Sequence, residues 1–252
     1  MKKTRKNLDF LKGLYIAHRG LHNKNAGIPE NSMSAFKAAL DAGVAAELDL
    51  HLLKDGKIAV FHDDNLHRMT GVDKNIKDCV YDEIKDLQLL GASSSDEKIP
   101  LLQDVLDLVD GKIILDIELK NDLPTGMLES AVSACLDNYK GGFIVKSFSP
   151  FTVKWFRKHR PQYIRGQLSC SFESNKDLSR IEKFICRNMF LNFLAKPDFI
   201  AYELQSLPKK RVEKYRKKNY PLLVWTIRSD EELSNAKKYG DSFIYENIKI
   251  VH

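Results

Sequence analysis

The sequence predicts an α/β fold with a parallel sheet, because short apolar runs alternate with amphipathic segments along most of the chain. Eight such runs are rich in β-branched residues, and helical segments follow them. Parallel neighbours need long crossover connections, so this alternation favours parallel pairing. Eight strand–helix units in 252 residues fit a closed (β/α)₈ barrel better than an open doubly wound sheet.

The apolar runs and the periodic segments between them locate the expected elements. Strands are expected at residues 14–17, 44–50, 113–119, 143–145, 163–168, 198–202, 221–226 and 242–245. Helices are expected at residues 32–41, 101–109, 129–136, 151–159 and 231–239, and residues 209–218 also have helical character. Neither G-x-G-x-x-G nor G-x-x-x-x-G-K-[ST] opens any of these helices, which weakens a nucleotide-binding interpretation.

One interval is longer than a crossover requires: more than 60 residues separate the second and third expected strands. It contains Asp55-Gly56 between two apolar runs, which is a strong signal for a β-hairpin. With these two residues as the turn, the register places His62 opposite Asp49 and Val60 opposite His51. We therefore expect a single domain over residues 1–252, with an insertion at approximately 51–98 on the C-terminal side of the barrel.

The composition excludes several classes of protein. Hydrophobic residues make up 43% of the chain, which is enough to bury a core and excludes intrinsic disorder. No apolar run approaches the roughly 18–20 residues that span a bilayer, and the basic N-terminus lacks the apolar stretch of a signal peptide. The four cysteines are scattered, so neither a zinc knuckle nor a disulfide framework is expected. A cytoplasmic globular protein is the expectation.

The net charge of +6 comes from one segment. Residues 209–218 contain seven Lys or Arg and one Glu, and the rest of the chain has 33 basic and 33 acidic residues. This segment is interpreted either as a solvated helix face or as a docking surface for anionic lipid or polyphosphate. No nucleic-acid-binding module is recognised, so nucleic acid is not an expected partner.

Charged side chains lie on strands that should be buried. Glu47 and Asp49 share one face of the second strand, and Glu118 lies near the end of the third. Buried carboxylates are costly unless they are paired or bind a cation. One interpretation is a structural ion pair with Arg19 or Lys120. The other is a ligand set of three oxygen donors for a hard divalent cation such as Mg²⁺ or Ca²⁺.

Two histidines flank these carboxylates. His18 ends the first strand, and the hairpin register brings His62 close to Asp49. Taken singly, His18 is compatible with a satisfied buried histidine and His62 with a surface histidine. Together they predict acid–base catalysis at a phosphate, in which one takes a proton from the attacking hydroxyl and the other gives one to the leaving alkoxide. Arg19 and Lys120 supply positive charge for an anionic substrate.

Short motifs recur along the chain in a characteristic order and spacing. They are His18-Arg19-Gly20, Pro29-Glu30-Asn31-Ser32, Glu47-x-Asp49, Lys54-Asp55-Gly56, His62-Asp63, Arg68-x-Thr70-Gly71, Ile117-Glu118-Leu119-Lys120, Ser147-Phe148 and Trp225-Thr226. As a set they make the chain resemble the glycerophosphodiester phosphodiesterase family, which has the TIM-barrel fold of phospholipase-C-like phosphodiesterases. The resemblance extends over almost the whole chain.

The resemblance implies a barrel with a small insertion after the second strand, and it assigns roles to individual residues. These are Glu47, Asp49 and Glu118 as ligands of a divalent metal, His18 and His62 as the acid–base pair, and Arg19 and Lys120 as phosphate contacts. The implied reaction is hydrolysis of a glycerophosphodiester to glycerol 3-phosphate and an alcohol, with the neighbouring glycerol hydroxyl attacking phosphorus first. The expected partner is that small-molecule substrate.

Other residues and substrates stay open. Trp225, at the end of the seventh strand, is expected either to pack against the glycerol carbons or to line the core. Glu246 lies near a position where family members often carry Asp, and Asp116 lies where they are often apolar. The first alternative function is a phosphodiesterase for lysophospholipids or phosphatidylinositol that docks on membranes through residues 209–218 without stable insertion. The second, a catalytically inactive barrel that acts as a binding protein, is disfavoured because every motif position expected to do chemistry has a competent residue.

Overall fold

The computed structural model describes residues 6–120, 123–176 and 178–250. The chain divides into two compact units, which are described separately. The N-terminal unit is Ile16–Ile144, and the C-terminal unit is Val145–His252 together with Met1–Tyr15. None of the helices in the described ranges has the length and hydropathy that crossing a bilayer requires.

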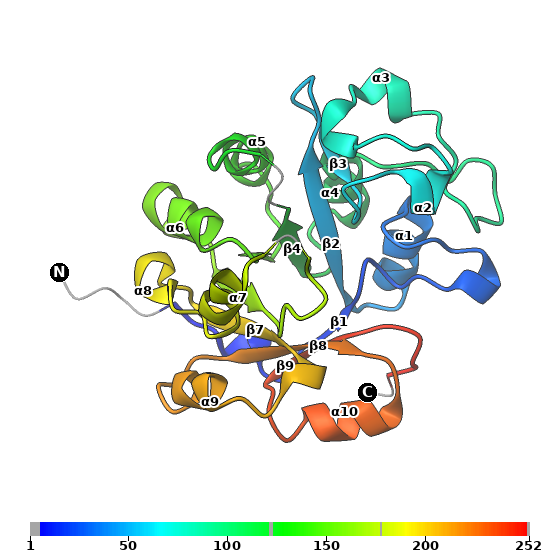
Figure 1. Cartoon of the computed structure of the whole chain (residues 1–252). Helices are drawn as coiled ribbons and strands as arrows, with labels where there is room; N and C mark the ends of the chain where they lie inside the picture. The colour runs from blue at the N-terminus through cyan, green and yellow to red at the C-terminus, as the bar shows by residue number, and fades with distance from the viewer. Residues whose placement is uncertain (1–5, 121–122, 177, 251–252) are drawn as a thin grey trace. The chain divides into compact units, whose positions relative to one another are not determined.

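The described residues form nine strands that belong to one sheet (Figure 1). They are β1 (Tyr15–Ala17), β2 (Ala45–Leu52), β3 (Ile58–Val60), β4 (Leu115–Leu119), β5 (Phe143–Ser147), β6 (Arg165–Ser169), β7 (Phe199–Glu203), β8 (Leu222–Ile227) and β9 (Ser242–Tyr245). Their order is β1-β9-β8-β7-β6-β5-β4-β2-β3, and β1 also pairs with β2, so eight strands close into a ring. This confirms the (β/α)₈ barrel and all eight expected strands.

The helices of the N-terminal unit begin where side chains satisfy free backbone N–H groups. They are α1 (Met33–Asp41), α2 (His67–Thr70), α3 (Tyr81–Ile84), α4 (Leu102–Val109) and α5 (Met127–Leu136), with 3₁₀ turns at Lys24–Ala26 and Ile76–Asp78. Ser32 caps α1, because its hydroxyl accepts a hydrogen bond from the backbone N–H of Ala35 at 3.1 Å. Ala35, Phe36 and Ala39 are then buried on one face of α1, as the expected amphipathic pattern requires.

Strand β2 is buried along all eight of its residues and is the central strand of the N-terminal unit. It pairs in parallel with β1 and with β4. In the register with β4, Asp49 lies beside Glu118 and Glu47 lies beside Asp116. Charged side chains therefore face one another across neighbouring strands in a buried part of the sheet.

The hairpin after β2 forms as expected, but its register differs by one residue from the expectation. Leu50 pairs with Val60, and the backbone N–H of Phe61 donates to the carbonyl of Asp49 at 3.0 Å. His62 is therefore not opposite Asp49, and Val60 is not opposite His51. The cause is a three-residue loop in place of the expected two-residue turn: residues 54–56 connect the strands, and Gly56 has a φ of +82°.

The chain between β2 and β4 has a hydrophobic cluster of its own, here called the hairpin cluster. Its members are Leu53, Ala59, Phe61, Leu66, Met69, Ile76, Cys79, Ile84, Leu89 and Ile99. Figure 1 shows this segment around β3, α2 and α3 in blue-green to cyan. His62 lies within it, so the packing of this cluster positions that side chain. The insertion bounds of 51–98 and the single-domain organisation stay predictions.

The C-terminal unit carries the remaining helices between its strands. They are α6 (Pro150–His159), α7 (Arg180–Arg187), α8 (Asn192–Ala195), α9 (Lys210–Arg216) and α10 (Asp230–Ala236), with 3₁₀ turns at Asp9–Leu11 and Leu204–Ser206. Ser149, Ser179 and Ser229 cap α6, α7 and α10 through their hydroxyl oxygens. The basic segment 209–218 contains α9, which confirms its helical character.

Candidate active site

The turn that follows β1 holds the backbone of the first motif against β2. The backbone N–H of Arg19 donates to Glu47 Oε2 at 3.0 Å, and the N–H of Gly20 donates to the Glu47 carbonyl at 3.0 Å. Arg19 and Gly20 both have positive φ, at 53° and 76°. A Cβ on Gly20 would lie 2.9 Å from the backbone carbon of Ala35, so only glycine fits this close approach. The turn therefore fixes the position of Glu47.

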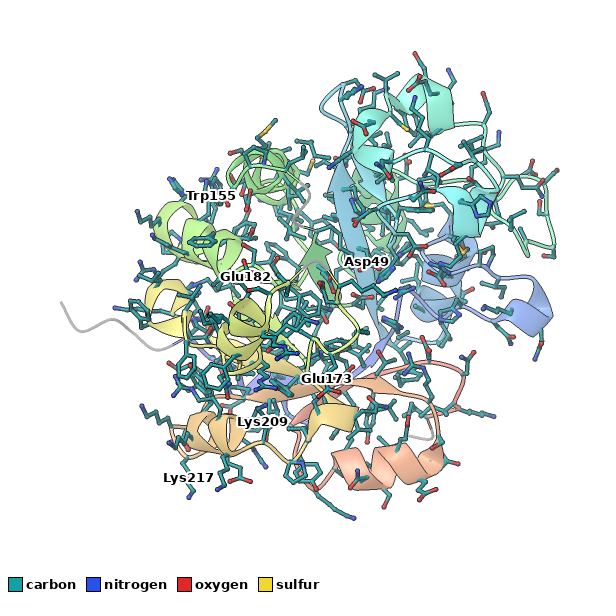
Figure 2. The ribbon with its side chains drawn as sticks, viewed as in Figure 1. Asp49, Trp155, Glu173, Glu182, Lys209 and Lys217 are labelled. Atoms are coloured by element: carbon teal, nitrogen blue, oxygen red, sulfur yellow. The ribbon has the colours of Figure 1, made fainter. Side chains whose placement is uncertain are left out.

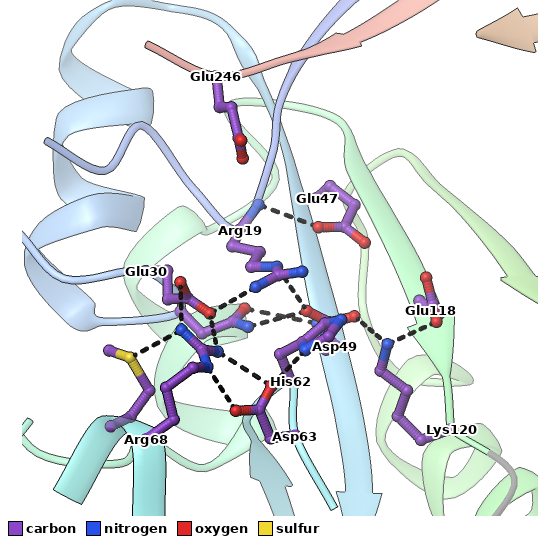
Figure 3. Close-up of polar contacts among 12 residues, drawn as sticks. Arg19, Glu30, Glu47, Asp49, His62, Asp63, Arg68, Glu118, Lys120 and Glu246 are labelled. Atoms are coloured by element: carbon purple, nitrogen blue, oxygen red, sulfur yellow. Dashed lines mark hydrogen bonds and ion pairs between the residues drawn. The ribbon is translucent and has the colours of Figure 1, made fainter. Parts of the chain in front are cut away.

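Three acidic side chains meet on β2 and β4. Glu47, Asp49 and Glu118 are all buried, and one carboxylate oxygen from each lies within 4.8 Å of the other two (Figure 3). Alternation along β2 places the first two on one face, and the β2–β4 register adds the third. Buried oxygen donors at this separation are the ligand set that a hard divalent cation prefers.

Two cations lie beside these carboxylates. Lys120 Nζ is 2.8 Å from Asp49 Oδ1 and 2.6 Å from Glu118 Oε1, and Arg19 Nε is 3.5 Å from Asp49 Oδ2. Burial would raise the pKa of Asp49, but Lys120, His62 and Arg19 together lower that pKa well below its usual value. Burial would likewise lower the pKa of Lys120, but Asp49 and Glu118 raise it. The structural ion pair considered from the sequence is therefore present.

The ion pairs do not remove the fit to a metal. Three buried carboxylates face Lys120 and Arg19, and Arg19 is shared with Glu30, with Nη1 2.6 Å from Glu30 Oε1. The local balance of charge is therefore negative, and a bound cation would reduce it. The residues present fit a divalent metal.

A chain of alternating charges leads from Arg19 to His62 (Figure 3). Glu30 also accepts from Arg68 Nη2 at 2.6 Å, and Arg68 Nε donates to Asp63 Oδ2 at 2.5 Å. Asp63 Oδ1 lies 2.6 Å from His62 Nδ1. An ionised Asp63 at this nitrogen favours the tautomer with its proton on Nδ1, which leaves Nε2 as the basic nitrogen of His62.

The acids of this chain are held ionised. Burial would raise the pKa of Glu30, but Arg68 and Arg19 lower it to about 2. Burial would also raise the pKa of Asp63, but hydrogen bonds with His62 and Arg68 lower it well below its usual value. Hydrogen bonds with Glu30 and Asp63 in turn raise the pKa of Arg68. Glu30, Asp63 and Arg68 are thus all charged near neutral pH.

The sequence analysis assigned no role to four members of this site, although each lies in a quoted motif. They are Glu30, Asn31, Asp63 and Arg68. Asn31 Nδ2 donates to Asp49 Oδ2 at 2.9 Å, and its own backbone N–H donates to the Arg19 carbonyl. Of these four roles, only that of Asp63 could have been inferred from the sequence, because Asp63 directly follows the predicted catalytic residue His62.

The remaining two residues predicted for the site are His18 and Trp225, and they lie in different units. His18 is half-buried between β1 and Arg19, in the N-terminal unit with the carboxylates. Trp225 lies on β8 of the C-terminal unit, where its ring packs edge-on against Phe148 with ring centroids 5.8 Å apart. The structure thus brings most of the predicted residues together in the N-terminal unit. The role of Trp225 stays a prediction.

The chain is similar to known phosphodiesterases. The model of the glycerophosphoryl diester phosphodiesterase family matches residues 18–249. A glycerophosphodiester phosphodiesterase of Caldanaerobacter subterraneus subsp. tengcongensis is 30% identical over 240 residues, which cover 91% of this chain and 92% of that protein. Human lysophospholipase D GDPD1 is 37% identical over 120 residues, 43% of this chain and 37% of that protein.

A solved structure has the same fold. It is an Oleispira antarctica phosphodiesterase in complex with its product sn-glycerol-3-phosphate, with a TM-score of 0.76, 22% identity and coverage of 93% of both chains. The family match spans nearly the whole chain and includes every predicted site residue. The chain therefore belongs to the glycerophosphoryl diester phosphodiesterase family, a family of hydrolases.

Proposed function

We propose that the chain hydrolyses glycerophosphodiesters to glycerol 3-phosphate and an alcohol. The observation that carries this proposal is the buried group of Glu47, Asp49 and Glu118, with Lys120 and Arg19 in contact with it. Such a site presents both anionic ligands for a cation and cationic contacts for a phosphate. The proposal keeps the cytoplasmic location expected from the sequence.

The phosphate is proposed to bind between the two cations. Arg19 and Lys120 are each partly committed to carboxylates, but a guanidinium has five N–H donors and an ammonium has three. Donors left over from the ion pairs can therefore contact phosphoryl oxygens. The contacts gain strength as charge builds on those oxygens in the transition state.

Proton transfer is proposed for His62 and His18. The contact between His62 Nδ1 and Asp63 orients the ring and leaves Nε2 to exchange a proton. His18 would act on the other oxygen, so that one histidine serves the attacking hydroxyl and the other serves the leaving alcohol. Trp225 is retained as a proposed contact to the glycerol carbons.

Glu47, Asp49 and Glu118 would hold the divalent metal, Mg²⁺ or Ca²⁺. When bound, that cation lowers the pKa of a coordinated hydroxyl and neutralises charge on the phosphate. Carboxylates are suited to both ions, and Lys120 keeps Asp49 and Glu118 close together.

The acid–base assignment is tested by His18→Ala and His62→Ala. Each is expected to reduce turnover of glycerophosphocholine by at least about a hundredfold, because general acid–base catalysis typically contributes that much. His67→Ala is the matched control, since His67 is exposed on α2. Near-normal turnover in both active-site variants, with an unchanged circular dichroism spectrum, would refute the assignment.

Metal dependence is tested separately by chelation. Exhaustive EDTA treatment is expected to abolish turnover, and adding back Mg²⁺, Ca²⁺ or Mn²⁺ one at a time identifies the preferred cation. Glu47→Gln is expected to weaken that cation's affinity, measured directly by isothermal titration calorimetry. Full activity after chelation would contradict the metal assignment.

A second candidate substrate class is supported by one comparison, the similarity to human lysophospholipase D GDPD1 over part of the chain. The reaction would be the same, and the leaving group or the glycerol substituent would differ. A panel of glycerophosphodiesters and lysophospholipids, each assayed for released alcohol, distinguishes the two. The higher kcat/KM identifies the substrate class.

A further inference from the structure

Helix α7 of the C-terminal unit is amphipathic, yet none of its residues is buried. Ile181 and Phe184, three residues apart on one face, are 73% and 48% exposed. Two more phenylalanines follow, with Phe190 40% and Phe193 68% exposed. The rings of Phe184 and Phe190 lie 5.5 Å apart. Large apolar side chains gathered on a surface mark an interaction site.

Cations lie on the faces of these exposed rings. The Arg187 guanidinium is 5.4 Å from the centroid of Phe184, and that of Arg211 on α9 is 5.1 Å from the centroid of Phe190. Arg211 also lies 5.6 Å from the ring of Tyr215. In the part of the chain that the structure describes, no carboxylate forms an ion pair with Arg187 or Arg211. Their charge is available to an external anion.

A hollow of about 320 Å³ lies on α9, and Arg211, which lies over the Phe190 ring, is part of its lining. It is lined by Arg211, Lys214, Tyr215, Lys217 and Lys218. This lining contains four cations and no acid, and Figure 2 marks Lys209 and Lys217 at the two ends of the helix. Burial and the neighbouring Arg187 lower the pKa of Lys209, although Glu173 opposes this, which agrees with crowding of positive charge.

The acids near this surface do not balance it. Residues 180–218 contain eleven Lys or Arg and four Asp or Glu. Glu182 caps α7 by accepting from the backbone N–H of Ser179, and Asp198 pairs with Lys6 and Arg165. We call Ile181, Phe184, Phe190 and Phe193 with the cations of α7 and α9 the α7–α9 surface.

We propose that the α7–α9 surface docks the protein on a bilayer that contains anionic phospholipids. The exposed apolar side chains enter the interfacial region, and Arg187 with the cations of the α9 hollow binds the phosphate groups. A second copy of the chain fits this surface poorly, because a twofold contact would place one cationic surface against another. This docking is separate from phosphodiester hydrolysis, and its test does not depend on the proposed reaction.

Vesicle flotation tests the proposal with the purified full-length chain. The probes are vesicles of phosphatidylcholine alone and of phosphatidylcholine with a quarter phosphatidylglycerol. The protein is expected to float with the anionic vesicles at low salt, about 50 mM, and to float much less with neutral vesicles or at about 500 mM salt. Absence of flotation with anionic vesicles at low salt would overturn the proposal.

Two sets of variants separate the apolar from the ionic contribution. Ile181→Ser with Phe184→Ser is expected to weaken partitioning by about tenfold or more. Arg211→Gln with Lys214→Gln and Lys217→Gln is expected to weaken it by about a hundredfold, because each cation near an anionic surface contributes a comparable increment. Phe151→Ser and Lys37→Gln, which change exposed residues elsewhere, are the controls and should bind as the wild type does.

Insertion is distinguished from adsorption by tryptophan fluorescence. Brominated lipids in anionic vesicles are expected to quench the fluorescence that the tryptophan of Phe184→Trp adds. They are not expected to quench the fluorescence added by Phe151→Trp, at an equally exposed position on α6. Equal quenching of the two would overturn the placement of this surface at the bilayer. The proposal would also be overturned if sedimentation equilibrium showed concentration-dependent dimerisation that Ile181→Ser with Phe184→Ser abolishes. A second copy of the chain would then occupy this surface. Thermal melts check that every variant is folded.

Discussion

The two units of the molecule carry their charge in opposite ways. In the N-terminal unit, Lys120 and Arg19 lie against buried carboxylates, and these ion pairs are largely shielded from solvent. In the C-terminal unit, Arg187 and Arg211 lie on exposed aromatic rings. Residues 16–144 contain 13 Lys or Arg and 22 Asp or Glu, and the rest of the chain contains 27 and 12, so the net charge of +6 is the difference between an acidic and a basic unit. The reaction is proposed for the first, where buried carboxylates outnumber the cations beside them.

The difference has a thermodynamic meaning. A buried charge that loses its partner remains out of water and uncompensated, whereas an exposed charge is stabilised by solvent. Charge-removing substitutions in the buried network of the N-terminal unit should therefore be strongly destabilising, and those on the α7–α9 surface should have almost no effect. Four variants test this contrast, from the largest expected effect to the smallest.

Lys120→Met removes the ammonium that lies between Asp49 and Glu118. The free energy of unfolding is expected to fall by about 3–5 kcal/mol, because Glu118 loses this ammonium and Asp49 keeps only the more distant Arg19 guanidinium beside it. Turnover is expected to be lost as well. Urea denaturation in EDTA measures the change without compensation by a metal, and Lys37→Met, at an exposed ion pair, is the control. A loss below about 1 kcal/mol would contradict the contrast.

Glu30→Gln removes the acid shared by Arg19 and Arg68. The folded-state pKa of Glu30 is lowered from 4.5 to about 2, so its stabilisation is complete above pH 4.5 and is lost as the pH falls to about 2. This contribution of Glu30 to the free energy of unfolding is about 3 kcal/mol. Wild-type stability should fall more steeply over this window than that of Glu30→Gln, as urea melts at several pH values would measure. Parallel curves would contradict the assignment.

Asp63→Asn removes the anion at His62 Nδ1. A reduction in kcat of about ten- to a hundredfold is expected with little change in KM, because the ring loses its orientation while the phosphate contacts remain. Steady-state kinetics measures the split between the two constants. Asp73→Asn, at an exposed acid that accepts from Asn65, is the matched control. An increase in KM alone would show that Asp63 acts on substrate binding instead.

Lys210→Gln with Lys217→Gln changes two cations of α9. The free energy of unfolding is expected to stay within about 0.5 kcal/mol of the wild type, and turnover of water-soluble glycerophosphocholine should be unchanged. Thermal denaturation and the same kinetic assay measure both. Destabilisation by more than about 1 kcal/mol would show that these cations make contacts comparable to those of the buried network, and the contrast would fail.

The strands and the carboxylate cluster were accessible from the sequence, because both follow from simple periodicity. Alternation along β2 places Glu47 and Asp49 on one face, and the parallel register adds Glu118. The hairpin register was not accessible. Asp55-Gly56 can form a two-residue turn or can end a three-residue loop. The two differ in backbone dihedral angles, and this sequence is compatible with both.

Two other features escaped for different reasons. The chain of ion pairs through Glu30 and Arg68 joins residues 38 apart in sequence, and no local pattern predicts such a contact. The exposure of Phe184 and Phe193 was invisible because a phenylalanine in an amphipathic segment is usually a core residue. Only the structure shows that α7 has no buried residue.

The stability of the hairpin cluster determines how the enzyme loses activity on heating. His62 and Asp63 lie in the segment that this cluster holds together, whereas Glu47, Asp49 and Glu118 lie on β2 and β4. A local opening of the cluster would release the histidine while the carboxylates stay in place on their strands. Amide hydrogen exchange in residues 61–79 would then be faster than exchange in β2. On heating, the enzyme would lose activity before the barrel unfolds.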